Sequence, residues 1–127
     1  MGQQYLIDSN AVIDYLSGKL HTDGMAFMNE IIDQIPVISV ITQIEILGYK
    51  TTSEAYRLLT GFVEDSDILG LSDDVIQRTI EIRKDHKIKT PDAIIAATAV
   101  VNKLTIITRN IKDFGKIDGL KVINPYE

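Results

Sequence analysis

Short apolar runs alternate with helical patterns along this chain, and that alternation is the feature that most constrains its fold. β-forming runs occur at residues 4–8, 36–40, 67–71, 104–108 and 121–124. Between them, apolar residues recur at the spacing of amphipathic helices. Such an alternation predicts right-handed crossovers and a parallel sheet. We expect an α/β fold with three layers, α/β/α, around a central, mostly parallel, doubly wound sheet with helices on both faces.

The expected helices contain the signals that usually start such elements. They cover residues 10–17, 23–34, 72–86 and 90–103, with further helical pattern after residue 40 through about 65. Asp23, Ser72 and Thr90 are the expected caps, and Pro91 suits a first helical position. Sheets of this type place their sites outside the carboxyl ends of the strands. The polar residues at those ends are therefore the candidates for chemistry.

Composition narrows the class of protein. The 127 residues suit a single domain spanning 1–127, and 45% hydrophobic residues favour a folded chain. The absence of cysteine excludes disulfides and thiolate metal sites. No signal peptide or membrane-spanning run is apparent, so we expect a soluble, cytoplasmic protein with no membrane partner. The net charge of −5 is not typical of a nucleic-acid binder.

Glu45 interrupts a nearly unbroken apolar run, residues 36–49. Burying an ionised carboxylate is costly unless it is paired or binds a metal. A structural explanation is also available, because Thr42 and Glu45 have the spacing of a capping box in which Thr42 caps the helix. Either way, Thr42 and Glu45 should share one face of the helix, while Ile44 and Leu47 turn toward the core.

Asp8 and Asp92 stand at two further element boundaries. Asp8 ends the first expected strand and could cap the next helix, but Ser9 or Asn10 could do so equally well. Asn10 could then orient the Asp8 carboxylate. Asp92 lies in the first turn of a helix of small and apolar residues, where the helix dipole alone would favour an acid. Asp14, one turn after Asn10, is expected to be a solvated helix residue.

Thr108, Asn110 and Asp113 follow the strand at 104–108 and could simply form a polar loop. If this loop meets Asp8, Glu45 and Asp92, several negative charges share a small volume. Without a cation, at least one carboxyl group should then stay protonated. Oxygen ligands, no cysteine and two histidines without ligand spacing favour Mg²⁺ or Mn²⁺ over Zn²⁺.

These segments resemble the PIN-domain family, in particular the VapC-type toxins of toxin–antitoxin pairs. "LIDSNAVIDYL" resembles the family's opening Asp-x-Asn segment, and "SVITQIEILGY" is similar to its Ser/Thr-x-x-Glu helix start. "KTPDAIIAATAV" resembles the third acidic motif, which is the most specific of the set. "LTIITRNIKDF" followed by "GLKVINPYE" resembles the closing segment. The matches span nearly the whole chain in the family's order.

The resemblance implies a Mg²⁺- or Mn²⁺-dependent endoribonuclease that hydrolyses RNA with a metal-activated water. It also implies a homodimer that is inhibited by the cognate antitoxin of a type II toxin–antitoxin pair. The implied catalytic and metal-binding residues are Asp8, Glu45, Asp92 and Asp113. Asn110 stands where many relatives carry an acid, so whether Asn110 or Asp113 completes the site stays open. Expected residues around the metal or orienting the substrate are Asn10, Thr42, Thr108 and Asn110. Expected contacts to RNA phosphates come from Arg83, Lys87, Lys89, Arg109 and Lys112.

Two other functions fit parts of the sequence. A phosphoryl-accepting receiver domain has similar length and architecture, and Asp73 or Asp74 could serve as its acceptor. That interpretation lacks a suitable lysine after "LTIIT". A non-catalytic interaction module would use all of the acids as helix caps, and it predicts no effect of divalent cations on thermal stability.

Overall fold

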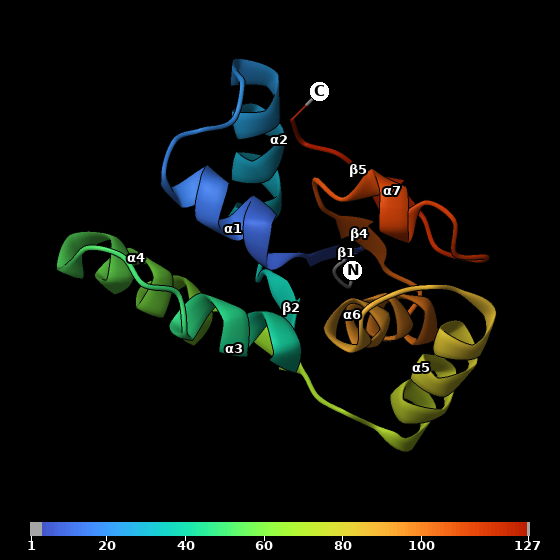
Figure 1. Ribbon diagram of the computed structural model, residues 1–127. Coiled ribbons are helices and arrows are strands. Elements are labelled where there is room, and N and C mark those ends of the chain that lie inside the picture. Colours follow the sequence, from blue (N-terminus) through green and yellow to red (C-terminus); the bar gives the residue numbers. More distant parts are fainter. Residues whose placement is uncertain (1–3, 127) are drawn as a thin grey trace.

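The computed structural model describes residues 4–126, and five short strands lie at its centre (Figure 1). They are β1 (Tyr5–Ile7), β2 (Val37–Ser39), β3 (Asp67–Leu69), β4 (Thr105–Ile107) and β5 (Val122–Ile123). Parallel ladders join β1 to β4, β4 to β5, and β2 to β3. The β2–β3 pair lies alongside β1. All five strands were predicted, and their parallel pairing confirms the expected fold class.

Seven helices are present in the described part of the chain. They are α1 (Ser9–Leu16), α2 (Thr22–Asp33), α3 (Val40–Leu47), α4 (Ser53–Glu64), α5 (Asp73–Asp85), α6 (Thr90–Val101) and α7 (Ile111–Phe114). The sequence pattern predicted all of these except α7, which was taken as part of a polar loop. A single helical turn is too short to give a periodic apolar pattern.

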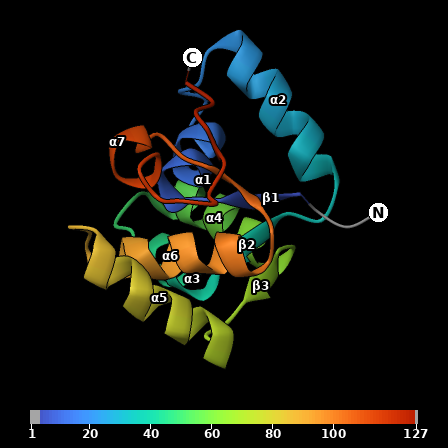
Figure 2. The same cartoon turned by 90° about the vertical axis from the view of Figure 1, so that its right-hand side faces the viewer.

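Side-chain alternation along the strands divides the interior into two cores, one on each face of the sheet. Leu6 and Ile106 point to the core that includes residues of α5 and α6. Ile7 and Ile107 point to the core formed with α1, α2 and α4. In Figure 2, α5 and α6 lie below β1 and α2 lies above it. The three-layer arrangement therefore follows from the period-2 pattern of two strands.

The predicted start of α3 was wrong. Ser39 caps this helix by accepting a 3.0 Å hydrogen bond from the backbone N of Thr42, which is itself fully buried. Because β2 runs directly into α3, the polar residue that ends the strand takes the cap, and no Thr42–Glu45 capping box forms. Thr42 and Ile46 turn inward, so Ile44, two positions from each, is 62% exposed instead of facing the core.

Two other expected caps differ from the structure, whereas Ser72 caps α5 as predicted. Asp8 caps α1, a role that the sequence left open between Asp8, Ser9 and Asn10. The residues before α2 and α6 are His21 and Lys89, and neither makes a side-chain cap bond. Asp23 and Thr90 lie inside the first turns instead.

Among the described residues, no helix is long and apolar enough to cross a membrane.

Candidate metal centre

Asp8 is placed by the junction of β1 and α1. Its backbone N donates to the carbonyl of Ile107 at 2.9 Å, which extends the β1–β4 pairing by one residue. Its carboxylate then accepts from the backbone N of Ser9 at 2.8 Å and caps α1. The acid therefore stands at the carboxyl end of β1, where a parallel sheet places its sites.

The Asp8 carboxylate is buried, with 4% of the residue exposed, and is held by two further side chains. Thr108 Oγ1 donates to Asp8 Oδ2 at 2.7 Å, and Asn10 Nδ2 reaches the same oxygen at 3.2 Å. Burial raises the pKa of Asp8, and these hydrogen bonds and the charge of Arg109 only partly oppose the rise. Asn10 and Thr108 therefore contact the acid that they were expected to support.

Glu45 lies on the exposed surface of α3, so the apolar run does not bury its charge. Its Oε1 accepts a 3.0 Å hydrogen bond from Ser9 Oγ, which joins α3 to the start of α1. Partial desolvation raises the pKa of Glu45 against this hydrogen bond, and the charges of Asp8 and Asp92 raise it further. Glu45 thus lies within electrostatic reach of both other acids.

Asp92 reaches the same region from the first turn of α6. Desolvation raises its pKa, the charges of Asp8 and Asp113 add to the rise, and the charge of Lys89 opposes it. Asp92 is therefore electrostatically coupled to Asp8, Glu45 and Asp113, which come from distant parts of the chain. That these acids share one metal site stays a prediction.

Asn110 and Asp113 are joined to Asp8 through Thr108. The backbone N of Asn110 donates to Thr108 Oγ1 at 3.1 Å. Asn110 caps α7 by accepting from the Asp113 backbone N at 3.3 Å, and its Nδ2 donates to Asp113 Oδ2 at 3.0 Å. Asn110 thus positions the Asp113 carboxylate, which favours Asp113 as the fourth acid.

The chemistry of these donors fits a hard divalent cation. Carboxylate oxygens are the ligands that Mg²⁺ and Mn²⁺ prefer, and mutually repelling acids with raised pKa values gain most from a bound cation. Within residues 4–126, however, no three His, Cys, Asp or Glu side chains are arranged so that they could hold a metal ion as they stand. The acids therefore match a hard cation in their chemistry but do not form a metal site in this structure.

The remaining expected residues fall into three groups. Thr42 is fully buried and receives a hydrogen bond from Ser39 Oγ at 3.2 Å, so it cannot contact a substrate in this structure. Lys89 and Arg109 lie close enough to change the pKa of Asp92 and Asp8, respectively. The pKa shifts of Asp8, Glu45 and Asp92 show no such influence from the other three expected cations, which are exposed: Arg83, Lys87 and Lys112.

Sequence reasoning missed three residues next to this region. Ser9 bridges to Glu45, as described above, and a hydroxyl beside the first acid was its only signal. Asp14, expected in solvent, has a side chain only 13% exposed and contacts Arg109 and Tyr126. The spacing of Asn10 and Asp14 on one helical face could have indicated this role. Tyr126 gave no local signal, because its contacts depend on how the chain end packs.

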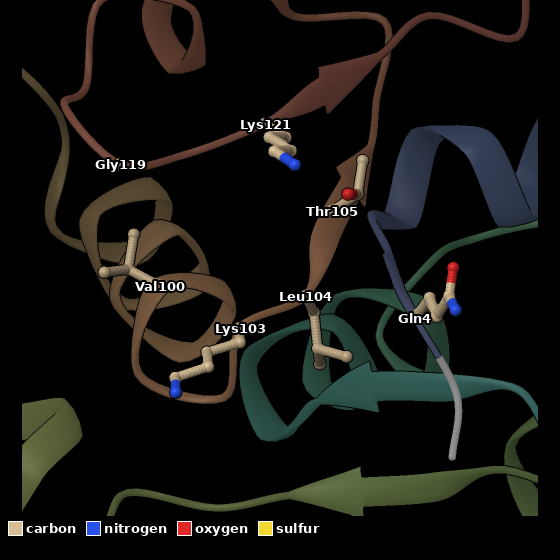
Figure 3. A pocket seen from close by; sticks show the side chains of 7 residues that line it. All are labelled: Gln4, Val100, Lys103, Leu104, Thr105, Gly119 and Lys121. Atoms are coloured by element: carbon tan, nitrogen blue, oxygen red, sulfur yellow. The ribbon is translucent and has the colours of Figure 1, made fainter. Parts of the chain in front are cut away.

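A separate hollow of about 440 Å³ opens at the opposite end of the strands (Figure 3). It is lined by Gln4, Leu104 and Lys121, which directly precede β1, β4 and β5, respectively. Lys103 and Thr105 also line it, and no acid does. Because it lies at the amino ends of parallel strands, this hollow is distinct from the acidic cluster of Asp8, Glu45, Asp92 and Asp113.

Comparisons with known proteins agree with this geometry. The family model described as PIN domain matches residues 5–120. A toxin–antitoxin complex from Klebsiella pneumoniae has a chain that is 35% identical with a TM-score of 0.76, and the match covers 97% of this chain and 98% of that one. FitAcB from Neisseria gonorrhoeae is 25% identical with a TM-score of 0.81, covering 97% and 99%.

A third solved structure shows the same fold at lower identity. DNA-bound VapBC from Salmonella typhimurium is 21% identical with a TM-score of 0.80, and the match covers 98% of this chain and 99% of that one. No curated protein matches the chain significantly. The matches extend over nearly the whole chain, so they concern the complete arrangement of strands and helices described above.

Proposed function

This chain belongs to the PIN domain family, and we propose that it is a divalent-cation-dependent endoribonuclease, the toxin of a type II toxin–antitoxin pair. One observation carries the proposal: Asp8, Glu45, Asp92 and Asp113 are electrostatically coupled at one edge of the sheet, and three of them have raised pKa values. Acids that repel one another in this way are poorly explained as four independent helix caps. The similarity to a chain of a toxin–antitoxin complex supports the same conclusion.

The four acids are the proposed ligands of Mg²⁺, with Mn²⁺ as a substitute. When bound, such a cation stabilises charge on the phosphodiester and lowers the pKa of a coordinated water. The chain's own residues prepare this site. Thr108 and Asn10 fix the Asp8 carboxylate, Ser9 holds Glu45, and Asn110 holds Asp113.

RNA is the proposed substrate, and its phosphates need positive charge beside the acids. Lys89 and Arg109 are the best-placed cations, because both lie within electrostatic reach of an acid. Arg83, Lys87 and Lys112 are exposed and could extend the contact. Local cations of this kind can bind a phosphate chain even though the net charge of the protein is −5.

The proposed partners are a cognate antitoxin and a second copy of the chain. The solved structures that resemble it include toxin–antitoxin complexes. Large apolar side chains are exposed on α3, α4 and α5, including Ile44, Leu58, Ile76 and Ile80. Exposed apolar side chains commonly lie in protein–protein interfaces. The cytoplasmic location and the single-domain organisation stay predictions.

The function is tested by cleavage of purified RNA in Mg²⁺ with the Asp92→Asn variant. Loss of one ligand charge should lower the rate by about 100-fold or more, as is usual when an electrostatic catalytic group is removed. Asp74→Asn is the matched control, since Asp74 is also a first-turn helix acid but is exposed on α5. Cleavage by Asp92→Asn at the wild-type rate would reject the assignment.

A further inference from the structure

The last described residue, Tyr126, is hydrogen-bonded to α1 beside the acidic cluster. Its hydroxyl donates to Asp14 Oδ2 and lies 3.2 Å from the carbonyl oxygen of Asn10. Its backbone N donates to Asn124 Oδ1 at 2.9 Å, which turns the segment after β5 back toward α1. One aromatic residue therefore ties the segment after β5 to the helix that follows Asp8.

Arg109 completes a three-residue cluster with Asp14 and Tyr126. Its Nη1 lies 3.4 Å from Asp14 Oδ2, and its guanidinium carbon lies 5.5 Å from the centroid of the Tyr126 ring. Its backbone N donates to Asn10 Oδ1 at 3.1 Å. The guanidinium is thus held by an acid and by an aromatic face, which are the two contacts that best orient an arginine.

The held guanidinium remains available to a ligand. The Arg109 side chain is 61% exposed, whereas that of Asp14 is 13% exposed. Arg109 is also close enough to lower the pKa of Asp8, so it stands at the rim of the acidic cluster. A free arginine in this position would be drawn toward the acids, but here Asp14 already accepts from it.

We propose that Asp14 and Tyr126 are positioning residues that hold the Arg109 guanidinium at the rim of the acidic cluster, turned to bind an RNA phosphate. This inference rests on the proposed function. Asp14 supplies the charge that competes with Asp8 for the guanidinium, and the Tyr126 hydroxyl fixes the Asp14 carboxylate. Fixing the arginine in advance lowers the entropy lost when it binds a phosphate.

The test measures kcat and KM for cleavage of a short single-stranded RNA in Mg²⁺. Arg109→Ala should raise KM about tenfold, the usual effect of losing one hydrogen bond to a charged group. Tyr126→Phe keeps the ring and removes the hydroxyl, and it should raise KM about threefold with little change in kcat. Tyr126→Phe added to Arg109→Ala should have no further effect, because the hydroxyl acts only through the arginine.

Two matched controls separate positioning from general destabilisation. Tyr56→Phe removes a tyrosine hydroxyl of α4 that donates to the Leu47 carbonyl at the end of α3, and Arg78→Ala removes a surface arginine paired with Glu81. Neither should change KM. The proposal is overturned if Tyr126→Phe leaves KM unchanged, or if it raises KM equally with and without Arg109.

A second measurement distinguishes failure of this inference from failure of the proposed function. Binding of the same RNA is measured in the Asp92→Asn background, where cleavage is not required. If the wild-type protein binds RNA but never cleaves it, the nuclease assignment fails, and the same set of variants decides the positioning role by affinity. If affinity does not depend on Arg109, the positioning role itself is rejected.

Discussion

Thr108 Oγ1 donates a 2.7 Å hydrogen bond to Asp8 Oδ2 across 100 residues of chain. Both residues are buried, and each directly follows a strand of the β1–β4 pair. Burial raises the pKa of Asp8, and this hydrogen bond is the strongest interaction opposing that rise. The pairing of two strands therefore sets the environment of the first acid.

Replacing Thr108 by Val should weaken Mg²⁺ binding by about 10- to 100-fold, the usual effect of losing a residue that orients a metal ligand. The variant keeps the side-chain shape but leaves Asp8 without its shortest hydrogen bond, while Thr108→Ser keeps the hydroxyl. Isothermal titration calorimetry measures the affinity. Thr98→Val is the control, because Thr98 is also buried but its hydroxyl donates to the Ile94 carbonyl within α6. Equal losses in both variants would contradict the specific role of Thr108.

Mg²⁺ should raise the melting temperature of the wild-type protein. A ligand that binds only the folded state at 100 times its Kd adds about 2.7 kcal/mol of stability. Asp8→Asn should abolish most of the shift, because it removes one charge from the proposed ligand set. Differential scanning fluorimetry measures the melting temperature in Mg²⁺, Mn²⁺ and EDTA. A melting temperature that is the same with and without both cations would favour the non-catalytic interaction module.

Removing the charge of Asp92 should stabilise the metal-free protein at neutral pH. Desolvation and the charges of Asp8 and Asp113 raise the folded-state pKa of Asp92 above the ordinary value of 3.8 for this side chain. The folded state then binds the proton more tightly than the unfolded state, so stability is lost as pH rises through the folded pKa. In EDTA, Asp92→Asn should melt above the wild type near pH 7, and the difference should shrink toward about pH 4.

Calorimetry over that pH range checks the sign of the Asp92 effect. Asp74→Asn again serves as control, and it should give no gain, because an exposed acid in a first helical turn is favourable to the helix. A lower melting temperature for Asp92→Asn at neutral pH without metal would contradict the repulsion between the acids.

Lys89→Ala should reduce the salt dependence of RNA binding. Each lysine–phosphate contact contributes about 0.7 to the slope of log affinity against log salt for a single strand. Lys103→Ala is a stringent control, since Lys103 is equally cationic but lies in the hollow at the amino ends of the strands (Figure 3). Filter binding across a salt series measures both slopes. A similar decrease in the two variants would mean that overall charge, and not position, governs binding.

Gly24→Ala should destabilise the fold by about 1–3 kcal/mol, the usual penalty for overpacking. A Cβ on Gly24 in α2 would collide with the backbone carbonyl of Pro125, next to Tyr126. Gly61→Ala has open space and should instead stabilise α4 by about 0.5–1 kcal/mol. Chemical denaturation measures both changes. A neutral Gly24→Ala would show that the segment after β5 does not pack tightly against α2.

Local patterns predicted every element except α7, and they indicated that the acids lie at the ends of strands and the starts of helices. Period-2 and helical apolar spacing depend on neighbours within one or two turns, so all five strands and the longer helices could be predicted from the residues alone. The rule that parallel sheets bind ligands at their carboxyl ends then selected Asp8 and Thr108. Cap positions were less reliable, because Ser39 and Thr42 both have the right chemistry and only the end of β2 decides between them.

The sequence by itself determined the order of strands and helices and the acids that end or begin them, because those features are encoded by residues close together in the chain. Only the tertiary structure decided the partners of those acids. Thr108 supports Asp8 because β1 and β4 pair in one register, and Ser9 meets Glu45 because α1 packs against α3. The Asp14–Arg109–Tyr126 cluster likewise joins three distant segments. Contacts of this kind depend on strand register and helix packing, which no short stretch of sequence specifies.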